Sequence, residues 1–375
     1  MPTAVPPSAE PRPADPSPRR AARATVSAAA LQHNLRRVRE LAPGARVLAV
    51  IKANGYGHGL VGTARALREA DAFAVARMEE AVALREAALE QPVVLLEGVL
   101  DAQQLPLASA LGLEVVVHSA EQLAMLEAAS LARPVQAWLK IDTGMNRLGF
   151  PPEAARDAAA RLGRCRNILP APRLMTHLAC ADERDDAVTG RQLERFAAAL
   201  GDLPGERSVA NSAATLWRPD THADWVRPGI MLYGVSPFAD RTGPELGLQP
   251  AMVLLSTVIA LRTVRRGERV GYGGVWTARE DTRLAIAAIG YGDGYSRHLG
   301  SGTPVLVRGQ RAPLAGRISM DMIAIDVSRV PGVEVGDEVM LWGAGLAVEE
   351  LARLAGTIPY ELLCGVTQRV GVTMR

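Results

Sequence analysis

Lysine is almost missing from this chain of 375 residues. Of its 42 basic residues, 40 are arginine and two, Lys52 and Lys140, are lysine. A chain with this bias uses arginine wherever a plain positive charge is sufficient. A lysine amine can lose its proton, form an imine or take up carbon dioxide, and a guanidinium does none of these readily. The two lysines are therefore the first candidates for chemistry.

Cysteine is also scarce, and neither sign of charge is in excess. The three cysteines, Cys165, Cys180 and Cys364, are too few and too scattered for a disulfide framework or a metal site, which suits a reducing compartment. A net charge of +2 gives no field that would attract nucleic acid or anionic lipid. No stretch reaches the roughly 18 to 20 uncharged apolar residues needed to span a bilayer. We expect a cytoplasmic protein without a metal, nucleic-acid or membrane partner.

The composition is that of a folded protein with one unusual end. An apolar content of 48% with 22% charged residues excludes a mostly disordered chain. Residues 1–24 differ, because they hold seven prolines and no apolar run. This segment predicts a disordered leader, and nothing in it predicts a role.

Short apolar runs alternate with helical patterns from residue 45 to residue 234. Eight such runs, separated by Ala/Leu/Glu/Arg-rich stretches, predict parallel strands with crossover helices. A doubly wound sheet is the alternative, but the first turn, KANGYGHG, lacks the GxGxxG spacing typical of that fold. We therefore predict an α/β fold with a (β/α)₈ barrel over residues 25–247. The runs are 46–52, 72–76, 92–98, 113–119, 135–142, 172–178, 207–212 and 225–234.

The pattern changes after residue 248. Strand-like segments bounded by glycine-rich turns follow one another, with few helical stretches before VEELARLAG at 348–356. This succession of strand-like segments and turns predicts a β-rich C-terminal domain over residues 248–375.

Residues able to take part in catalysis or cofactor binding lie at the predicted carboxyl ends of the barrel strands, where barrel enzymes place their active sites. Both lysines are among them, and the loops after strands seven and eight offer a hydroxyl and backbone N–H groups suited to a phosphate. A reactive lysine beside a phosphate site is what a pyridoxal phosphate enzyme needs. The residues at these ends are Lys52, Lys140, His177, Asn211, Ser212, Arg227, Gly229 and Ile230.

These residues lie in motifs that resemble those of the alanine racemases. AVIKANGYGHG around Lys52 resembles the family's cofactor-attachment motif, and seven further blocks follow in the family's order. They are KIDTGMNRLGF, MTHLACAD, ANSAAT, VRPGIMLYG, VGYGGVW, GYGDGYSR and GRISMDM. The resemblance covers nearly the whole chain after residue 24. It implies pyridoxal phosphate as cofactor, alanine as substrate and the same barrel-plus-β-domain architecture.

The resemblance also implies the catalytic residues. Lys52 corresponds to the lysine that binds the cofactor and acts as a base at the α-carbon. Tyr272 corresponds to the second base, which works on the opposite face. His177 and Arg227 match the residues that the family places behind that tyrosine. A permanent cation at Arg227, against the pyridine nitrogen, weakens the ring as an electron sink and is expected to limit side reactions.

Further roles follow from the same blocks. Tyr56 matches a phosphate contact, together with Ser212, Gly229 and Ile230. Arg147 matches a residue near the substrate carboxylate, and Lys140 matches a lysine that carries a carbamate in many members. Met320 and Tyr291 match a backbone donor to the substrate carboxylate and a residue of the entry corridor. Some members of the family have a phosphate-contacting tyrosine near the carboxyl terminus; this chain departs from that pattern with Gln368, and we expect no such contact here.

The family arrangement also implies a partner. Tyr272 and Met320 complete the barrel site of a second copy, which makes the expected assembly a head-to-tail homodimer with shared sites. Three other readings stay open: a racemase of different specificity, a related decarboxylase, and a cofactor-free Schiff-base aldolase. A barrel that binds pyridoxal phosphate without catalysis fits less well, because such proteins usually lack a second domain.

Overall fold

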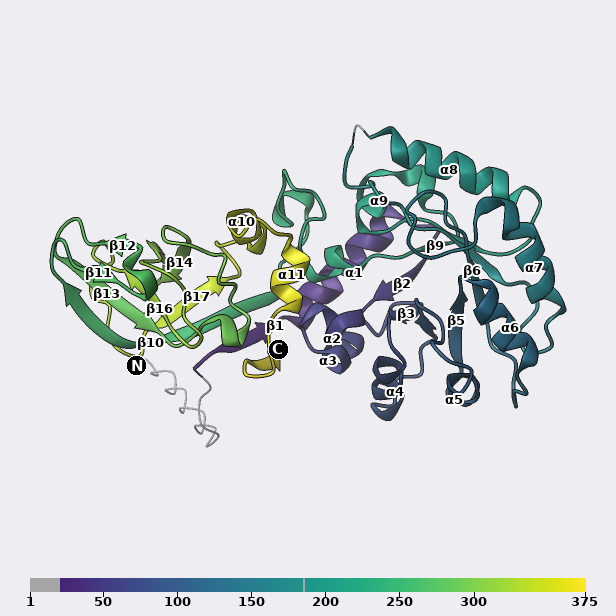
Figure 1. Cartoon of the computed structure of the whole chain (residues 1–375), viewed down its shortest axis with the longest axis horizontal. Helices are drawn as coiled ribbons and strands as arrows, with labels where there is room; N and C mark the ends of the chain where they lie inside the picture. The colour runs from purple at the N-terminus through teal and green to yellow at the C-terminus, as the bar shows by residue number, and fades with distance from the viewer. Residues whose placement is uncertain (1–20, 185) are drawn as a thin grey trace, which may run out of the picture.

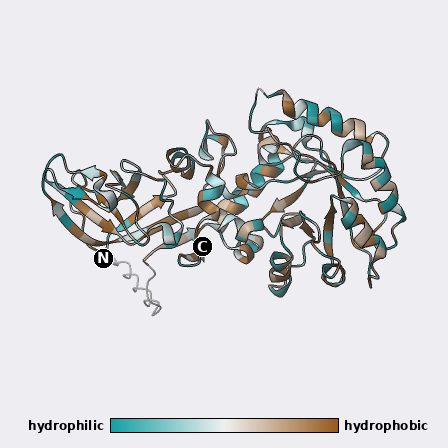
Figure 2. Ribbon diagram, in the orientation of Figure 1, coloured by the Kyte–Doolittle hydropathy of each residue, from teal (hydrophilic) through white to brown (hydrophobic). Residues whose placement is uncertain are grey.

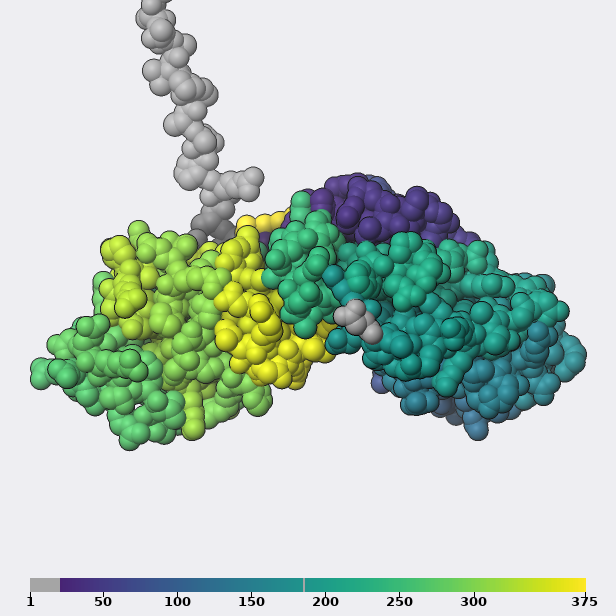
Figure 3. Space-filling model, turned by 90° about the horizontal axis from the view of Figure 1, so that it is seen from above, coloured from purple at the N-terminus to yellow at the C-terminus, as the bar shows by residue number. Residues whose placement is uncertain are grey.

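The computed structural model describes residues 21–184 and 186–375. They form two lobes, a barrel and a β domain, that lie side by side along the long axis of the molecule (Figures 1 and 3). The predicted leader, residues 1–24, lies outside the described residues except for residues 21–24.

The barrel is closed by eight parallel strands, each paired with the next along the chain and the last with the first. They are β2 (Arg46–Val50), β3 (Ala72–Val75), β4 (Val93–Leu95), β5 (Leu113–Val117), β6 (Ala137–Lys140), β7 (Arg173–Met175), β8 (Arg207–Ser208) and β9 (Trp225–Val226). Each lies inside one of the eight apolar runs of the sequence. The predicted (β/α)₈ barrel is confirmed.

Helices surround these strands. Strands β3 to β6 are buried along their whole length, as expected for parallel strands covered on both faces. Figure 2 shows the barrel strands mostly in hydrophobic colours and the outer helices in mixed ones. The helices are α1 (Ala28–Leu41), α2 (Lys52–Tyr56), α3 (Leu60–Ala66), α4 (Met78–Glu86), α5 (Gln104–Ala110), α6 (Ala120–Ala128), α7 (Ala155–Arg164), α8 (Ala187–Leu200) and α9 (Ser212–Trp217).

Helix α1 precedes the first barrel strand but completes the ring of helices, because it contacts both α3 and α9. Its start is fixed by Ser27, whose hydroxyl accepts the N–H of Ala30 at 3.1 Å. Leu31, Leu35 and Val38 recur at helical spacing and are fully or almost fully buried against the barrel.

The second lobe is built on an eight-stranded sheet in which 13-residue β10 pairs with three other strands, β1, β13 and β17. Its strands are β1 (Arg23–Val26), β10 (Met252–Val264), β13 (Thr282–Ala287), β14 (Pro304–Val307), β15 (Gln310–Pro313), β16 (Ile323–Asp326), β17 (Glu338–Trp342) and β18 (Gly371–Met374). A hairpin of β11 (Arg269–Val270) and β12 (Trp276–Thr277) extends from it, and α10 (Val348–Leu354) and α11 (Pro359–Cys364) face the barrel. The predicted β-rich C-terminal domain is confirmed.

Both ends of the described chain enter this sheet. β1 lies between β10, antiparallel, and β18, parallel, so Arg23 and Ala24 belong to a strand and not to a leader. The sequence pattern missed this because RATV is too short to show which sheet it joins. The division of the chain at residue 247 stays a prediction.

One hydrophobic core runs through both lobes and across their junction. Among the described residues, no helix has the length and apolar content required to cross a membrane.

Candidate active site

A cavity of about 700 Å³ lies at the carboxyl ends of the barrel strands, and helices α10 and α11 of the β domain close one side of it. Many of the residues singled out in the sequence meet in its wall, although they are spread over nearly 180 positions of the chain. They are Lys52, Tyr56, Lys140, Arg147, His177, Asn211, Ser212, Arg227, Gly229 and Ile230.

The segment that carries Lys52 into the cavity has an unusual backbone. Ala53, Asn54, Gly55 and Tyr56 have φ angles of 54°, 55°, 61° and 51°, so they form a left-handed turn. This conformation costs about 1–2 kcal/mol for each residue with a Cβ atom. Strain of this kind concentrates at functional sites, where the surrounding structure holds it in place.

Hydrogen bonds hold the turn. The N–H of Gly57 donates to the carbonyl of Ala53 at 3.0 Å, and the N–H of Gly59 donates to that of Asn54 at 2.9 Å. The Asn54 side chain accepts the N–H of Leu60 at 2.9 Å. As a result, the side chains of Lys52 and Tyr56 both line the cavity from one short segment.

Tyr56 and Gly229 approach each other closely. A Cβ on Gly229 would lie 2.4 Å from the Tyr56 hydroxyl, so only glycine leaves room for it. The hydroxyl of Ser212 accepts the N–H of Gly229 at 2.8 Å, and Ile230 begins the 3₁₀ turn η3 (Ile230–Tyr233) with an N–H that has no acceptor inside that turn. These donors form a cradle suited to a phosphate group.

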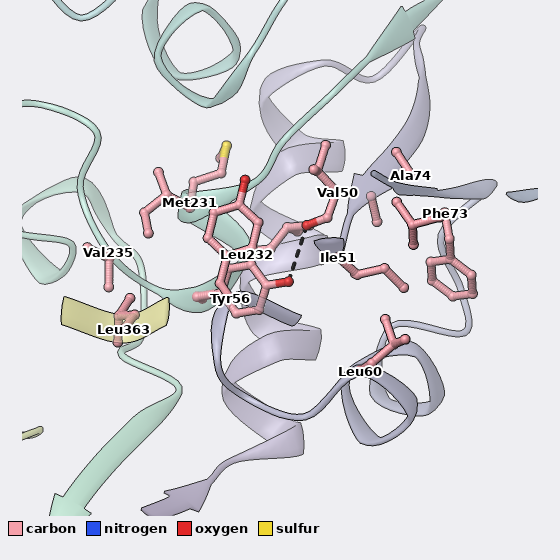
Figure 4. Packing of buried hydrophobic residues seen from close by; sticks show 14 of the residues in the cluster. Val50, Ile51, Tyr56, Leu60, Phe73, Ala74, Met231, Leu232, Val235 and Leu363 are labelled. Atoms are coloured by element: carbon pink, nitrogen blue, oxygen red, sulfur yellow. Dashed lines mark hydrogen bonds between the residues drawn. The ribbon is translucent and has the colours of Figure 1, made fainter. Parts of the chain in front are cut away.

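Tyr56 is fixed by its apolar surroundings. Figure 4 shows it among Val50 of β2, Leu232 of η3 and Leu363 of α11, and its ring stacks on that of Tyr233 at 4.7 Å. Burial raises the pKa of the Tyr56 hydroxyl above its usual range, so the group keeps its proton and acts as a donor.

Arg227 is buried in the floor of the cavity. Its Nη1 donates to the hydroxyl of Ser208 at 2.6 Å, and its Nη2 donates to the carbonyl of Thr176 and to Nδ1 of His177, the latter at 3.3 Å. Burial lowers the pKa of the guanidinium to about 10, which leaves it charged at neutral pH. Burial and this cation hold the pKa of His177 well below its usual range, so the ring is neutral and carries its proton on Nε2.

Cations and carboxylates both line the cavity, and the carboxylates are those of Glu97, Asp182, Glu183 and Glu349. Within the described part of the chain, none of Lys52, Lys140, Arg147 and Arg227 forms an ion pair with an acidic side chain. Burial and the neighbouring cations, Arg227 first, lower the pKa of Lys140 to about 8. The site therefore favours ligands with several negative charges.

Two polar side chains beside these cations hold backbone. The carboxylate of Asp142 accepts the N–H groups of Gly144 at 2.9 Å and of Arg147 at 3.1 Å, which fixes the loop that carries Arg147. Asn211 caps α9 by accepting the N–H of Ala214 at 3.1 Å. Among residues 21–184 and 186–375, no cluster of three His, Cys, Asp or Glu side chains is arranged to hold a metal ion.

The other predicted residues lie away from this cavity. Tyr272, Met320 and Tyr291 are on the surface of the β domain, with 66%, 52% and 39% of their surface exposed, and none of them lines the cavity of its own chain. Tyr272 begins the short turn between β11 and β12, which Figure 1 shows at the far end of the molecule from α2. One chain alone does not bring Tyr272 to Lys52.

Two cavity residues of α11 were not predicted. Tyr360 lies 6.0 Å from Tyr56 between ring centres, and Cys364 lies at the end of the same helix. The aromatic residue near the chain's end that lines the cavity is thus Tyr360, and Gln368 does not line it. The Ile-Pro start of α11 marks a helix in the sequence, but no local signal indicates which side of it faces the barrel.

Comparison with known proteins agrees with this site. The family models described as alanine racemase, N-terminal domain, and alanine racemase, C-terminal domain, match residues 26–237 and 251–374. The alanine racemase of Nitrosococcus oceani is 54% identical over 353 residues, which cover 94% of this chain and 98% of the relative. The alanine racemase of Vibrio cholerae is 50% identical over 351 residues, with 94% and 97% covered.

Solved structures of alanine racemases also superpose on this chain. The biosynthetic alanine racemase from Pseudomonas aeruginosa superposes with a TM-score of 0.92 at 48% identity, over 95% of this chain and all of that one. The alanine racemase from E. faecalis superposes with a TM-score of 0.88 at 34% identity, over 95% and 98% of the two chains. Because both family models match and relatives about half identical cover nearly its full length, the chain belongs to the alanine racemase family.

Proposed function

We propose that this protein interconverts L-alanine and D-alanine, with pyridoxal phosphate bound covalently to Lys52. The observation that carries the proposal is a single cavity that brings together both lysines of the chain, the donors around Gly229 and Ile230, and cations that form no ion pair among the described residues. Relatives named alanine racemase, matched over almost their whole length, support it.

The residues of the cavity fit the cofactor. Tyr56, Ser212, Gly229 and Ile230 offer donors for the phosphate, and the space between Tyr56 and Gly229 is one that a Cβ would fill. The unpaired cations offset the charges of a phosphate, a phenolate and a substrate carboxylate. When bound, pyridoxal phosphate withdraws electrons from the α-carbon of the amino acid and makes its proton acidic.

The chain's own residues then move that proton. Nζ of Lys52, released when the amino group of alanine replaces it on the cofactor, would take the proton from, or return it to, one face of the α-carbon, and the Tyr272 hydroxyl of a second copy would do the same on the opposite face. His177, neutral with its proton on Nε2, stands between this tyrosine and Arg227. Arg227, as a fixed cation in the cavity floor, would disfavour protonation of a ring nitrogen placed against it and so would limit side reactions.

The remaining residues position the substrate and the cofactor. Arg147 binds near the substrate carboxylate and Met320 of the second copy offers a backbone N–H to it. Lys140, with a pKa of about 8, has enough neutral amine to take up carbon dioxide, and the resulting carbamate would hold Arg147. Asn211 supports the cofactor from the cap of α9, and Tyr291 lines the corridor.

This arrangement requires a head-to-tail homodimer. The exposure of Tyr272, Tyr291 and Met320 on the β domain supports it, because these side chains are accessible to a second copy. We further propose that the enzyme works in the cytoplasm, where its product D-alanine supplies peptidoglycan synthesis or feeds alanine catabolism.

Two measurements test the proposal. Borohydride reduction of the holoenzyme followed by peptide mapping is expected to label Lys52 and not Lys140. Tyr272→Phe is expected to lose α-proton exchange from one alanine enantiomer much more than from the other. Label on Lys140, or a fully active Tyr272→Phe in both directions, contradicts the assignment.

A further inference from the structure

A second cavity, about 10 Å³ in volume, lies in the junction between the barrel and the β domain. His58, directly after the left-handed turn, lines it from the barrel side. Trp342, at the end of β17, and Glu349, in α10, line it from the β domain. This volume holds the centre of one water molecule and nothing larger.

His58, a residue of this cavity's lining, has an unpaired acceptor. Its Nδ1 contacts two carbonyls, those of Tyr56 at 2.8 Å and of Gly55 at 3.1 Å, so Nδ1 carries a proton and donates. Burial lowers the pKa of the ring to about 4, which leaves it neutral and Nε2 an acceptor. The ring is 1% exposed, and Nε2 has no hydrogen-bond partner among the described residues.

Trp342 presents an unpaired donor. Its indole is also 1% exposed, and the Nε1–H has no acceptor in the part of the chain that the structure describes. Buried polar groups left without partners are rare in native proteins, and such groups are commonly satisfied by an ordered water. An acceptor on one wall and a donor on the other wall of a one-water cavity are complementary.

We infer that this cavity is a binding site for one ordered water, which donates to Nε2 of His58 and accepts from Nε1–H of Trp342. The Glu349 carboxylate, which lines the same cavity and accepts two backbone N–H groups through Oε1, supplies further polar surface. The small cavity shares Glu349 with the wall of the large one, and the water site needs no cofactor.

The water has a structural consequence for the larger cavity. His58 binds the carbonyls of Gly55 and Tyr56, two residues of the strained turn that carries Lys52. Through the water, the β domain at Trp342 is joined to that turn by hydrogen bonds. His58 is thus a positioning residue, and the water makes the turn's stability depend on the β domain.

A crystal structure of the enzyme at high resolution tests the site. We expect a density peak within hydrogen-bond distance of both nitrogens in the wild type, and its loss in Trp342→Phe, which keeps a ring but removes the donor. Tyr295→Phe is the matched control, because its hydroxyl is also buried without a partner nearby, with its ring 6.3 Å from that of Trp342, but does not line the cavity. A dry cavity in the wild type, a direct His58–Trp342 bond, or a peak that survives in Trp342→Phe overturns the proposal.

Hydrogen exchange tests the coupling to the turn. Amides of residues 53–60 are expected to exchange about five- to tenfold faster in Trp342→Phe than in the wild type, with Tyr295→Phe unchanged. This readout is independent of cofactor and activity. Equal exchange in all three proteins shows that the turn is held without the water and overturns the coupling.

Discussion

Both ends of the barrel contain cationic side chains, but these are paired with carboxylates at one end and not at the other. At the amino ends of the strands, Arg173 lies between Glu114 and Glu206, at 2.6 and 2.8 Å, and over the indoles of Trp138 and Trp225 at 5.0 Å from each. Each indole N–H donates to one of these carboxylates, at 2.7 and 2.9 Å. Every charge here has a partner, and the arrangement closes the bottom of the barrel.

At the carboxyl ends, the cations have no such partners. Trp138 and Lys140 are two residues apart in β6, and one belongs to the closed end while the other lines the cavity. The difference shows that cationic residue type alone does not mark a site. What distinguishes the cavity end is that Lys52, Lys140, Arg147 and Arg227 form no ion pair within the described residues, although carboxylates also line the cavity.

The largest effect is expected at Lys52. Lys52→Arg keeps the positive charge but removes an amine that forms an imine and transfers a proton, so racemisation should fall by about 10⁴-fold in both directions. The unfolding temperature should change little, because no ion pair of the described structure is lost. Chiral chromatography of the product and thermal denaturation measure the two quantities, and a large loss of stability would contradict the contrast between the ends.

Arg173→Met, at the end closed by ion pairs, should lower stability and leave activity nearly unchanged. It leaves the buried Glu114 without its cation, whereas Glu206 keeps Arg46, and breaking a buried pair on one side costs about 3 kcal/mol. We expect a lower denaturant midpoint with kcat/KM nearly unchanged under native conditions. Glu114→Gln with Arg173→Met should recover part of the loss, and a full loss of activity in folded protein would show that the two ends are not independent.

The state of Lys140, at the cavity end of the barrel, is expected to depend on pH. Because its pKa is lowered to about 8, the neutral amine that reacts with carbon dioxide increases as pH rises through 8. Enzyme supplied with ¹³C-bicarbonate should therefore give a stronger carbamate signal at pH 9 than at pH 7 by NMR. Lys140→Arg is the control and should give none; an identical signal in this variant assigns the carbamate elsewhere.

A small stabilisation is expected at Ala53. Its φ of 54° is unfavourable for a residue with a Cβ atom, so Ala53→Gly should raise the free energy of unfolding by about 0.5–1 kcal/mol. Chemical denaturation measures this change, with Ala74→Gly in the regular strand β3 as a control that should destabilise. A destabilised Ala53→Gly would mean that the left-handed turn carries no strain at this position.

Much of the architecture follows from local patterns. The eight barrel strands could be predicted because each is a continuous buried run between helical patterns. The residues of the cavity followed from their places at the strand ends and from the family's motifs. Tyr360 could not be predicted, since the side of α11 that meets the barrel depends on how the two lobes pack. The left-handed turn was also missed, because Ala53 and Tyr56 carry no preference for it.

The sequence by itself determined the barrel, the β domain and the two lysines available for chemistry, because strand periodicity and residue type are properties of short segments. Only the tertiary structure decided which charges are neutralised, since partners such as Arg46 and Glu206 are 160 positions apart. It also decided that Tyr272 lies outside the cavity of its own chain. Pairing and distance depend on the packing of remote segments, and no local pattern encodes them.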